Sequence, residues 1–537
     1  MKYIFLIFGG MITLMAIFAN QLGIDNDTGW GGGRTLLLKV GLVIFLFGLM
    51  LLIFRAQLQK LQIKVRDLLH SANRDVAIGI VFVFIAVLTA FGYNWLLRDK
   101  SDSDKIYNYY SELAKGFRSG NLYLPETPSP ALLAMENPYD TALRKQMDIE
   151  DFPWDVTLYK GRFYIYWGPT PAFLLLPFSD DFLANIEDFH LTLVFAFGLF
   201  LYSAVTVTTL WKRLKSAPVW MLAILLLVLG FSVPMTTMLG RGEVYEAAIF
   251  ACQFFFIGGC YWASMSLMDA SPIPWKFALA ALHWAFAIGA RVTILPAVAI
   301  AALIMCLPML FTMQARLKPL IAAVLPLLAG GAALAWYNWA RFGSIFEFGI
   351  RYQLANVDYT QFKGSFGLQY IAENLRVYFL HPVNFQSRYP FLSMVEYTAS
   401  NDRLSGLLYI APFIVLIFLP LYRLVFRMKE NTHYNKVLVM YTGAAMVSAI
   451  FIFTFYFITL RYTLDFLPST LIAIAVSLGL EYEAWKEKRF MTSGISSLVS
   501  ALALVNVTMG ILLASPESGT AFMLNFLNSA SKLLGLK

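Results

Sequence analysis

Residues 276–316 read KFALAALHWAFAIGARVTILPAVAIAALIMCLPMLFTMQAR. Lys276, Arg291 and Arg316 are the charged residues of this stretch, and everything between them is apolar or uncharged. A single helix of this length would extend about 60 Å at 1.5 Å per residue, about twice the hydrocarbon thickness of a bilayer. We therefore expect two membrane helices that form a hairpin, with Arg291 at the turn between them.

The whole chain has the composition of a membrane protein. Of its 537 residues, 59% are hydrophobic and 14% are charged, whereas soluble domains carry about 25% charged residues. The mean hydropathy is +0.64, and apolar runs of roughly 17 to 25 residues recur along the chain, each long enough to cross a bilayer. These features predict an all-α polytopic membrane protein rather than several soluble domains.

Cysteine and charge exclude other classes of function. The three cysteines, Cys252, Cys260 and Cys306, all lie in apolar runs, so no disulfide framework or thiolate metal site is indicated. The formal net charge is +8, but the basic residues are spread over short connections between apolar runs. That distribution is typical of cytoplasmic membrane loops and does not indicate binding to nucleic acid.

Basic clusters predict the topology. Those near residues 55–74, 212–215, 276, 316–318, 423–429 and 486–489 mark returns to the cytoplasmic side, so an even number of crossings separates each pair. This parity places helix turns on the external side at three arginines, Arg241, Arg291 and Arg461. We expect about 13 spans, with a cytoplasmic N-terminus in the inner (plasma) membrane of a bacterium.

The expected organisation has three parts. Residues 1–75 hold two extra N-terminal helices and a cytoplasmic loop, residues 76–514 form the core, and residues 515–537 form an external tail. Two long external loops, at 98–188 and 339–405, interrupt the core and are expected to carry short amphipathic helices, one of them near residues 112–117. Long loops within a compact fold are usually functional.

The loops and the outer turns are rich in carboxylates, aromatic rings and basic residues, which is typical of an enzyme that binds a sugar. We expect the substrate to be bound by the following residues: Tyr110, Lys160, Arg162, Tyr164, Glu243, Arg351 and Asp465.

An acidic run in the first loop is a candidate catalytic site. Asp102 and Asp104 follow the third apolar run closely and should lie near the membrane boundary. Transfer of a sugar to a hydroxyl group needs one carboxylate as general base, and an aspartate is ionised at neutral pH. No second acid is needed when the leaving group is a lipid phosphate. The two residues could also hold a divalent metal ion, or they could form a solvated turn without a catalytic role.

The three arginines at the outer turns are candidates for binding the donor phosphate. Guanidinium groups bind phosphate oxygens in bidentate geometry, and an ionisable residue at such a position is a functional-site candidate. Arg291 has no acidic neighbour in the sequence. Alternatively, the arginines anchor helices at the membrane surface or form structural ion pairs with Asp465 and Glu243.

Several motifs resemble those of GT-C integral-membrane glycosyltransferases, and specifically of the bacterial relatives of protein O-mannosyltransferases and aminoarabinose transferases (glycosyltransferase family 39). The resemblance covers most of the chain after about residue 76. The matching segments are YYSELA at 109–114, GNLYL at 120–124, YKGRFY at 159–164, GPTPA at 168–172, RFGS at 341–344, RY at 461–462 and DF at 465–466.

The resemblance implies an inverting transfer of a sugar from a polyprenyl-phosphate-linked donor to a glycan, lipid or protein acceptor on the external side. It places the catalytic acid in the first external loop, where Asp104 matches best, followed by Asp102 and then Asp155. The chain departs from the family in its two extra N-terminal helices and in the position of its acidic run. Alternatives are a transporter or flippase of lipid-linked sugars, and a noncatalytic assembly subunit.

Overall fold

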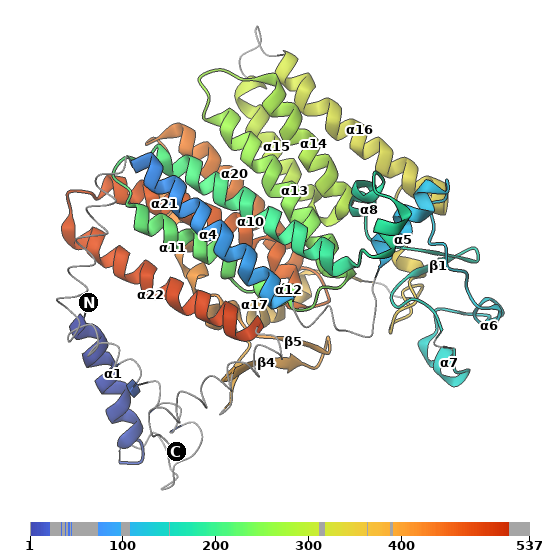
Figure 1. The fold of residues 1–537 in the computed structure, drawn as a ribbon, viewed down its shortest axis with the longest axis horizontal. Helices are drawn as coiled ribbons and strands as arrows, with labels where there is room; N and C mark the ends of the chain where they lie inside the picture. The colour runs from blue at the N-terminus through green and yellow to red at the C-terminus, as the bar shows by residue number, and fades with distance from the viewer. Residues whose placement is uncertain are drawn as a thin grey trace.

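The computed structural model describes residues 2–21, 34, 38, 41, 42, 45, 74–97, 108–149, 151–310, 317–361, 364–386 and 390–514, and the statements below concern these residues. Most of them are helical, and the long helices form one bundle (Figure 1). The predicted second N-terminal helix, the run with Asp102 and Asp104, and the tail at 515–537 lie wholly or mostly outside the described residues.

Helix α1 (Lys2–Ile17) precedes the bundle in the chain. The bundle helices are α4 (Arg74–Leu96), α10 (Asp188–Lys212), α11 (Val219–Phe231), α12 (Met235–Leu239), α13 (Val244–Leu267), α14 (Pro274–Ala290), α15 (Leu295–Leu310), α16 (Leu317–Phe342), α19 (Phe418–Phe426), α20 (Thr432–Phe453), α21 (Leu467–Ala484) and α22 (Arg489–Ala514).

Seven helices among the described residues are long and apolar enough to cross a membrane. They comprise α4, α10, the α11–α12 unit, α13, α16, α20 and α22. The predicted number of about 13 spans is therefore not established. One reason is that α14 and α15 have 17 and 16 residues, fewer than the roughly 20 that a helix needs to cross the hydrocarbon core of a bilayer.

The helices differ in how much of their apolar surface is buried, which shows which of them lie at the centre of the bundle and which on its outside. In α13, 83% of the apolar stretch is buried inside the protein, whereas the value for α16 is 11%. Helix α14 packs between these two helices. Leu325, Leu328 and Trp336 of α16 are mostly exposed, at 63%, 64% and 58%, so α16 presents an apolar face to the outside, as a lipid-facing helix does.

The predicted helix turns at the three arginines are confirmed. Arg241 lies between α12 and α13, Arg291 ends α14, and Arg461 lies in η5 (Leu460–Asp465) between α20 and α21. Arg291 has extended backbone angles, and a short 3₁₀ turn, η1 (Val292–Ile294), follows it before α15. All three breaks occur where apolar sequence is interrupted by a basic residue.

The first long loop carries α5 (Tyr109–Arg118), α6 (Pro130–Leu133), α7 (Thr141–Gln146), β1 (Thr157–Tyr159), β2 (Arg162–Tyr164), α8 (Thr170–Leu175) and α9 (Asp180–Ala184). Helix α5 confirms the amphipathic helix expected near residues 112–117. The β1–β2 hairpin turns on Lys160 and Gly161, which both have positive φ, as a two-residue turn that follows the strand twist requires. The sequence analysis did not predict these strands.

The second long loop carries η2 (Ile350–Tyr352), η3 (Leu368–Tyr370), α17 (Ile371–Leu380), β3 (Val383–Phe385), β4 (Leu392–Tyr397), β5 (Asp402–Leu404) and α18 (Leu407–Ile410), and η4 (Pro412–Ile417) leads into α19. Strands β3, β4 and β5 form an antiparallel sheet in that order. The two loops are joined by hydrogen bonds, among them Leu354 N to Val156 O at 2.8 Å and Arg144 Nη2 to Ala355 O at 2.7 Å.

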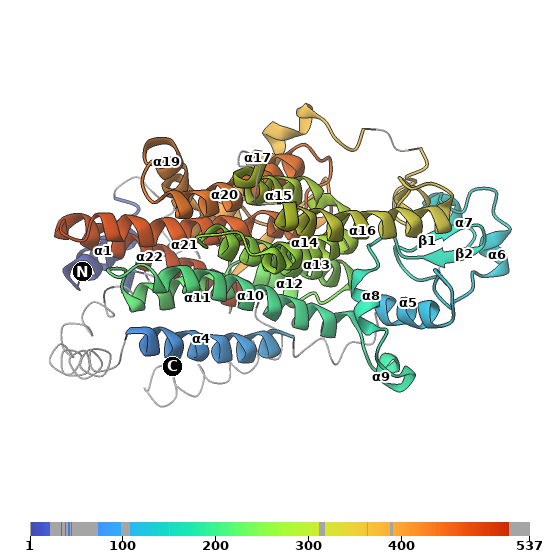
Figure 2. The same ribbon diagram turned by 90° about the horizontal axis from the view of Figure 1, so that it is seen from above.

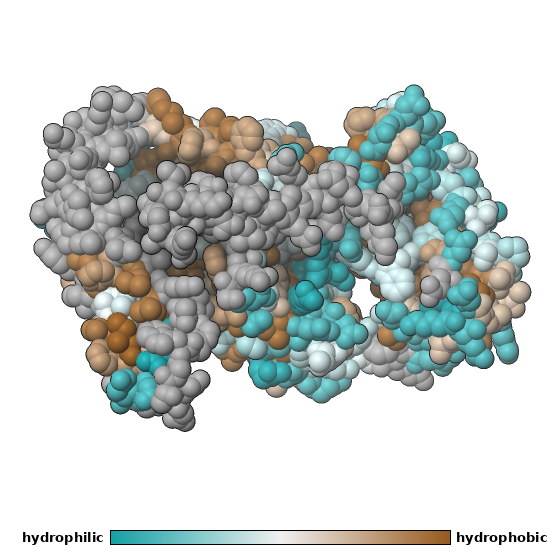
Figure 3. Space-filling view, turned by 60° about the horizontal axis from the view of Figure 1, so that its bottom comes forward, coloured by the Kyte–Doolittle hydropathy of each residue, from teal (hydrophilic) through white to brown (hydrophobic). Residues whose placement is uncertain are grey.

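The elements α5–α9 and the β1–β2 hairpin gather at one end of the bundle (Figure 2). At this end the surface is mostly hydrophilic, whereas apolar residues gather over the helices (Figure 3). Gly168 fixes the loop to the bundle, because its amide donates to Ala290 O at 3.1 Å. A Cβ atom at Gly168 would lie 2.0 Å from the carbonyl oxygen of Gly289, so a larger residue would force the loop away from α14.

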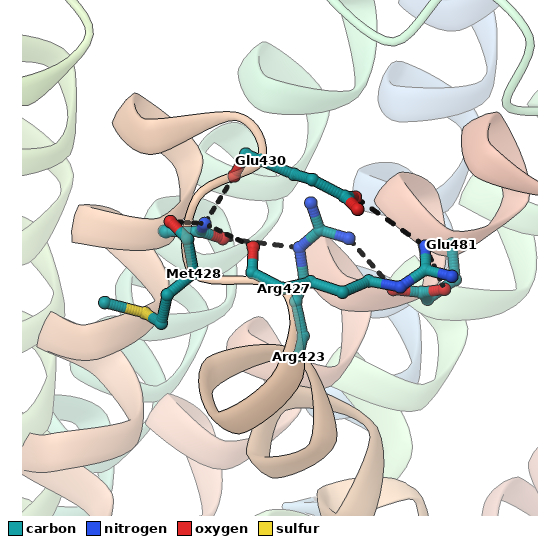
Figure 4. A network of polar contacts seen from close by, with 6 residues as sticks. Arg423, Arg427, Met428, Glu430 and Glu481 are labelled. Atoms are coloured by element: carbon teal, nitrogen blue, oxygen red, sulfur yellow. Dashed lines mark hydrogen bonds and ion pairs between the residues drawn. The ribbon is translucent and has the colours of Figure 1, made fainter.

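A buried ion network connects α19, α20 and α21 (Figure 4). Arg423 donates to Glu481 at 2.9 Å, and both side chains are fully buried. Arg427 lies 3.3 Å from the other oxygen of Glu481. The Asn435 side chain accepts from Arg423 and donates to the carbonyls of Arg427 and Met428. Glu430 also lies 3.7 Å from Arg427, so two carboxylates balance the two arginines.

Candidate active site

Asp155 is the predicted catalytic carboxylate that lies within the described residues. It lies two residues before β1 and has φ of +64°, a left-handed conformation that aspartate tolerates better than most residues. The Tyr245 hydroxyl, from the first turn of α13, donates a short hydrogen bond to Asp155 Oδ2. Burial raises the pKa of Asp155, while hydrogen bonds from Tyr245 and Gln353 and the charge of Arg461 oppose that rise.

Arg461 contacts the ring of the same tyrosine, Tyr245. Its guanidinium carbon is 4.2 Å from the centre of the Tyr245 ring, close enough for a cation–π interaction. Among the residues that the structure describes, no carboxylate lies within ion-pair distance of Arg461. Burial disfavours its charge, but the buried carboxylate of Glu246 and neighbouring tyrosines raise the pKa of Arg461. Arg461 is therefore a charged guanidinium to which no carboxylate of the described residues is directly bound.

Arg291, in contrast, is paired. Its Nη1 donates to both oxygens of Asp465, at 2.7 Å each, and Gln253 Nε2 also approaches Asp465 Oδ1 at 3.4 Å. The missing acidic partner of Arg291 thus comes from η5, as the structural-pair alternative predicted. Tyr462 lies between the two arginines, with its ring centre 5.1 Å from Arg291 and 6.0 Å from Arg461.

Arg241 is paired as well, with Asp402 of the second long loop at 2.5 Å. The Thr459 hydroxyl donates to the other oxygen of the same carboxylate. Burial favours the neutral acid, but Arg241 and Thr459 hold the pKa of Asp402 below its ordinary value. The pair ties β5 to the turn between α12 and α13. Asp402 was not predicted from the sequence.

The remaining predicted residues lie at several places. Glu243 caps the N-terminus of α13 in a reciprocal hydrogen-bonded arrangement with Glu246, and its charge acts on Asp155. Tyr110 is fully buried in the apolar core. Asp102 and Asp104 lie outside the described residues.

The residues of the hairpin and its surroundings contact aromatic rings. Arg162 lies 3.9 Å from the Tyr123 ring centre, and Lys160 lies 5.3 Å from that of Tyr159. Tyr164 contacts Phe342 with ring centres 5.4 Å apart. Arg351 is exposed in η2.

Tyr245 is the functional candidate that sequence reasoning missed. It links Asp155 and Arg461, and its ring also packs edge-on against Trp167 at 5.2 Å. Its position two residues after the predicted outer turn that ends in Glu243 was the available signal, because it places Tyr245 four residues from Arg241 in the chain.

No group of three or more histidine, cysteine, aspartate or glutamate side chains within the described ranges could hold a metal ion. The possible divalent site at Asp102 and Asp104 lies outside those ranges.

Comparisons with known proteins give little beyond this geometry. No protein-family model matches the chain, and no curated protein matches it. A crystal structure of the Archaeoglobus fulgidus oligosaccharyltransferase in the apo form is similar to it over 82% of this chain and 56% of that chain, so the match spans little more than half of the archaeal protein. The identity is 11% and the TM-score is 0.42, and a likeness this weak carries no argument about activity.

Proposed function

We propose that this protein is a membrane glycosyltransferase of the GT-C type, which moves a sugar with inversion from a polyprenyl-phosphate-linked donor to an acceptor hydroxyl. The observation that supports this best is that Asp155 and Arg461 both contact Tyr245. A carboxylate suited to a base and a guanidinium that no described carboxylate pairs with contact the same side chain.

In the proposed reaction, Asp155 takes the proton of the acceptor hydroxyl while the acceptor oxygen attacks the anomeric carbon. The bond between that carbon and the phosphate oxygen breaks, and the phosphate leaves with the electron pair, so no acid has to protonate it. Arg461 binds the phosphate as its charge increases, which lowers the barrier because the stabilised charge develops in the transition state. Asp104 and Asp102 remain the other candidate bases.

Aromatic side chains offer a path for the lipid part of the donor. Phe366 is 48% exposed, and its ring centre lies 5.0 Å from that of Phe455. Phe455 in turn lies 5.9 Å from Tyr462, which adjoins the arginines. A polyprenyl chain lying on these rings would place its phosphate at Arg461. We further propose that residues 76–514 form the catalytic core in a bacterial plasma membrane, with the loop end external.

The test uses full-length protein in proteoliposomes and a panel of radiolabelled undecaprenyl-phosphate hexoses and pentoses. Asp155→Asn should keep donor binding and lose transfer by roughly 100-fold or more, which is typical of removing a general base. The matched control is Asp148→Asn, an exposed aspartate of the same loop that also has positive φ. Undiminished transfer by Asp155→Asn would move the role of base to Asp104 or Asp102. Absence of transfer by the wild type from every donor would reject the function.

A further inference from the structure

A cavity in the first long loop has no role in the reaction described so far. It has a volume of about 760 Å³ and lies between α5, α7 and the segment that leads to β1. That volume lies in the ~300–1,000 Å³ range of small-molecule sites. Its lining includes Tyr109, Glu112, Glu126, Asp151, Phe152 and Trp154.

The carboxylates of the cavity are only partly neutralised. Glu112 forms an ion pair with Lys115 at 2.6 Å, but among the described residues Glu126 and Asp151 have no hydrogen-bond or ion-pair partner. Partial burial raises the pKa of Glu126, and the nearby charges of Asp151 and Glu112 raise it further. Two hydrogen-bond-accepting carboxylates are thus open to a ligand.

Neither basic residue of the lining forms an ion pair with Glu126 or Asp151. Arg144 directs its donors to the carbonyls of Pro138 and Ala355, so its guanidinium is already occupied by the protein. Lys145 is the remaining cation of the lining. An acidic group placed beside Glu126 and Asp151 would therefore meet two unpartnered carboxylates, and Lys145 is the cation of the lining whose donors no described residue takes.

The cavity shares a wall with the candidate active site. Trp154, which is 46% exposed in the cavity, directly precedes Asp155. The Tyr109 hydroxyl donates to the Trp154 carbonyl at 2.8 Å, and the Tyr109 ring contacts Trp167 at 5.9 Å. Since Trp167 packs on Tyr245, which donates to Asp155, one group of aromatic side chains in mutual contact runs from the cavity to the proposed base.

We propose that this cavity binds the acceptor, and that the acceptor is a saccharide with free hydroxyl or amino groups and no acidic group. This inference rests on the proposed function. Ionised carboxylates only accept hydrogen bonds, so Glu126 and Asp151 match the hydroxyl or ammonium donors of a sugar. Trp154, which is 46% exposed, offers a flat apolar surface for the C–H groups of a sugar ring, and an amphipathic ring of this kind is common at binding surfaces.

The experiment probes detergent-purified full-length protein on an array of neutral, amino-bearing and uronic-acid-containing oligosaccharides, followed by titration of each bound saccharide. The variant Glu126→Gln/Asp151→Asn keeps the shape of the cavity and removes its charge. The matched control is Glu136→Gln/Asp181→Asn, which changes two exposed carboxylates of the same loop outside the cavity.

We expect the wild type and the control to bind neutral or amino saccharides, and the cavity variant to bind them about 10- to 100-fold more weakly, as expected for losing hydrogen bonds to charged groups. Equal binding of uronic-acid saccharides, unchanged affinity of the cavity variant, or no saccharide binding at all would overturn the proposal. Failure of the enzyme function is recognised separately. Saccharide binding without transfer in proteoliposomes rejects the transferase, whereas transfer that depends on Asp155 with unaltered acceptor affinity in the cavity variant rejects only the acceptor site.

Discussion

Arg291→Ala should destabilise the protein, because it leaves the carboxylate of Asp465 without its cation. The two side chains are 17% and 9% exposed, and Arg291 Nη1 serves both carboxylate oxygens at 2.7 Å. Breaking one side of a buried ion pair costs about 3–5 kcal/mol. The hydrogen bond from the Gln253 amide to Asp465 Oδ1 is 3.4 Å long, too long to replace the lost ion pair. We expect the free energy of unfolding to fall by about that amount.

The assay is unfolding of the detergent-purified protein by graded addition of SDS, followed by circular dichroism. The double variant Arg291→Ala/Asp465→Asn removes the stranded charge and should recover most of the loss. Arg461→Ala serves as the control, since it strands no directly paired carboxylate and should cost at most about 2 kcal/mol, the upper range of a cation–π contact. A stable Arg291→Ala protein, or a double variant no more stable than the single one, would refute the reasoning.

Three further predictions concern charge. Tyr245→Phe removes a hydrogen bond that favours ionised Asp155, so the pKa of Asp155 should rise. The base works only when deprotonated, and the acid limb of the pH–rate profile should therefore move to higher pH. Arg461→Ala should weaken binding of radiolabelled undecaprenyl-phosphate sugar by roughly 10- to 100-fold, and Arg461→Lys should restore only part because it lacks the guanidinium fork; wild-type binding by both variants would remove Arg461 from the donor site. Glu481→Gln leaves the buried guanidinium of Arg423 without its counter-charge and should cost about 3–5 kcal/mol of unfolding free energy, which the same SDS titration measures.

Sequence patterns predicted the features that depend on local composition. Interrupted apolar runs located the helix breaks at Arg241, Arg291 and Arg461, and amphipathic periodicity located α5. The partners of the arginines depend on contacts between segments far apart in the chain. Asp402 pairs with Arg241 over 161 residues, and nothing in the local sequence of either residue indicates the other. The β1–β2 hairpin was missed because its strands have three residues each, too short for a period-2 pattern.

From the sequence, the three arginines were equal candidates for binding the donor phosphate. In the structure they differ in their partners. Two of them have a carboxylate at 2.5–2.7 Å that satisfies their charge, so a phosphate group would have to compete with that carboxylate. Arg461 instead contacts the face of the Tyr245 ring. The negative charge of buried Glu246 favours its charged form without direct contact. A buried ion without a partner costs several kcal/mol, and no carboxylate of the described residues pairs with Arg461, whereas Arg241 and Arg291 are both paired. A bound anion would supply the missing partner, which is why Arg461 rather than Arg291 is the arginine we propose for the donor phosphate.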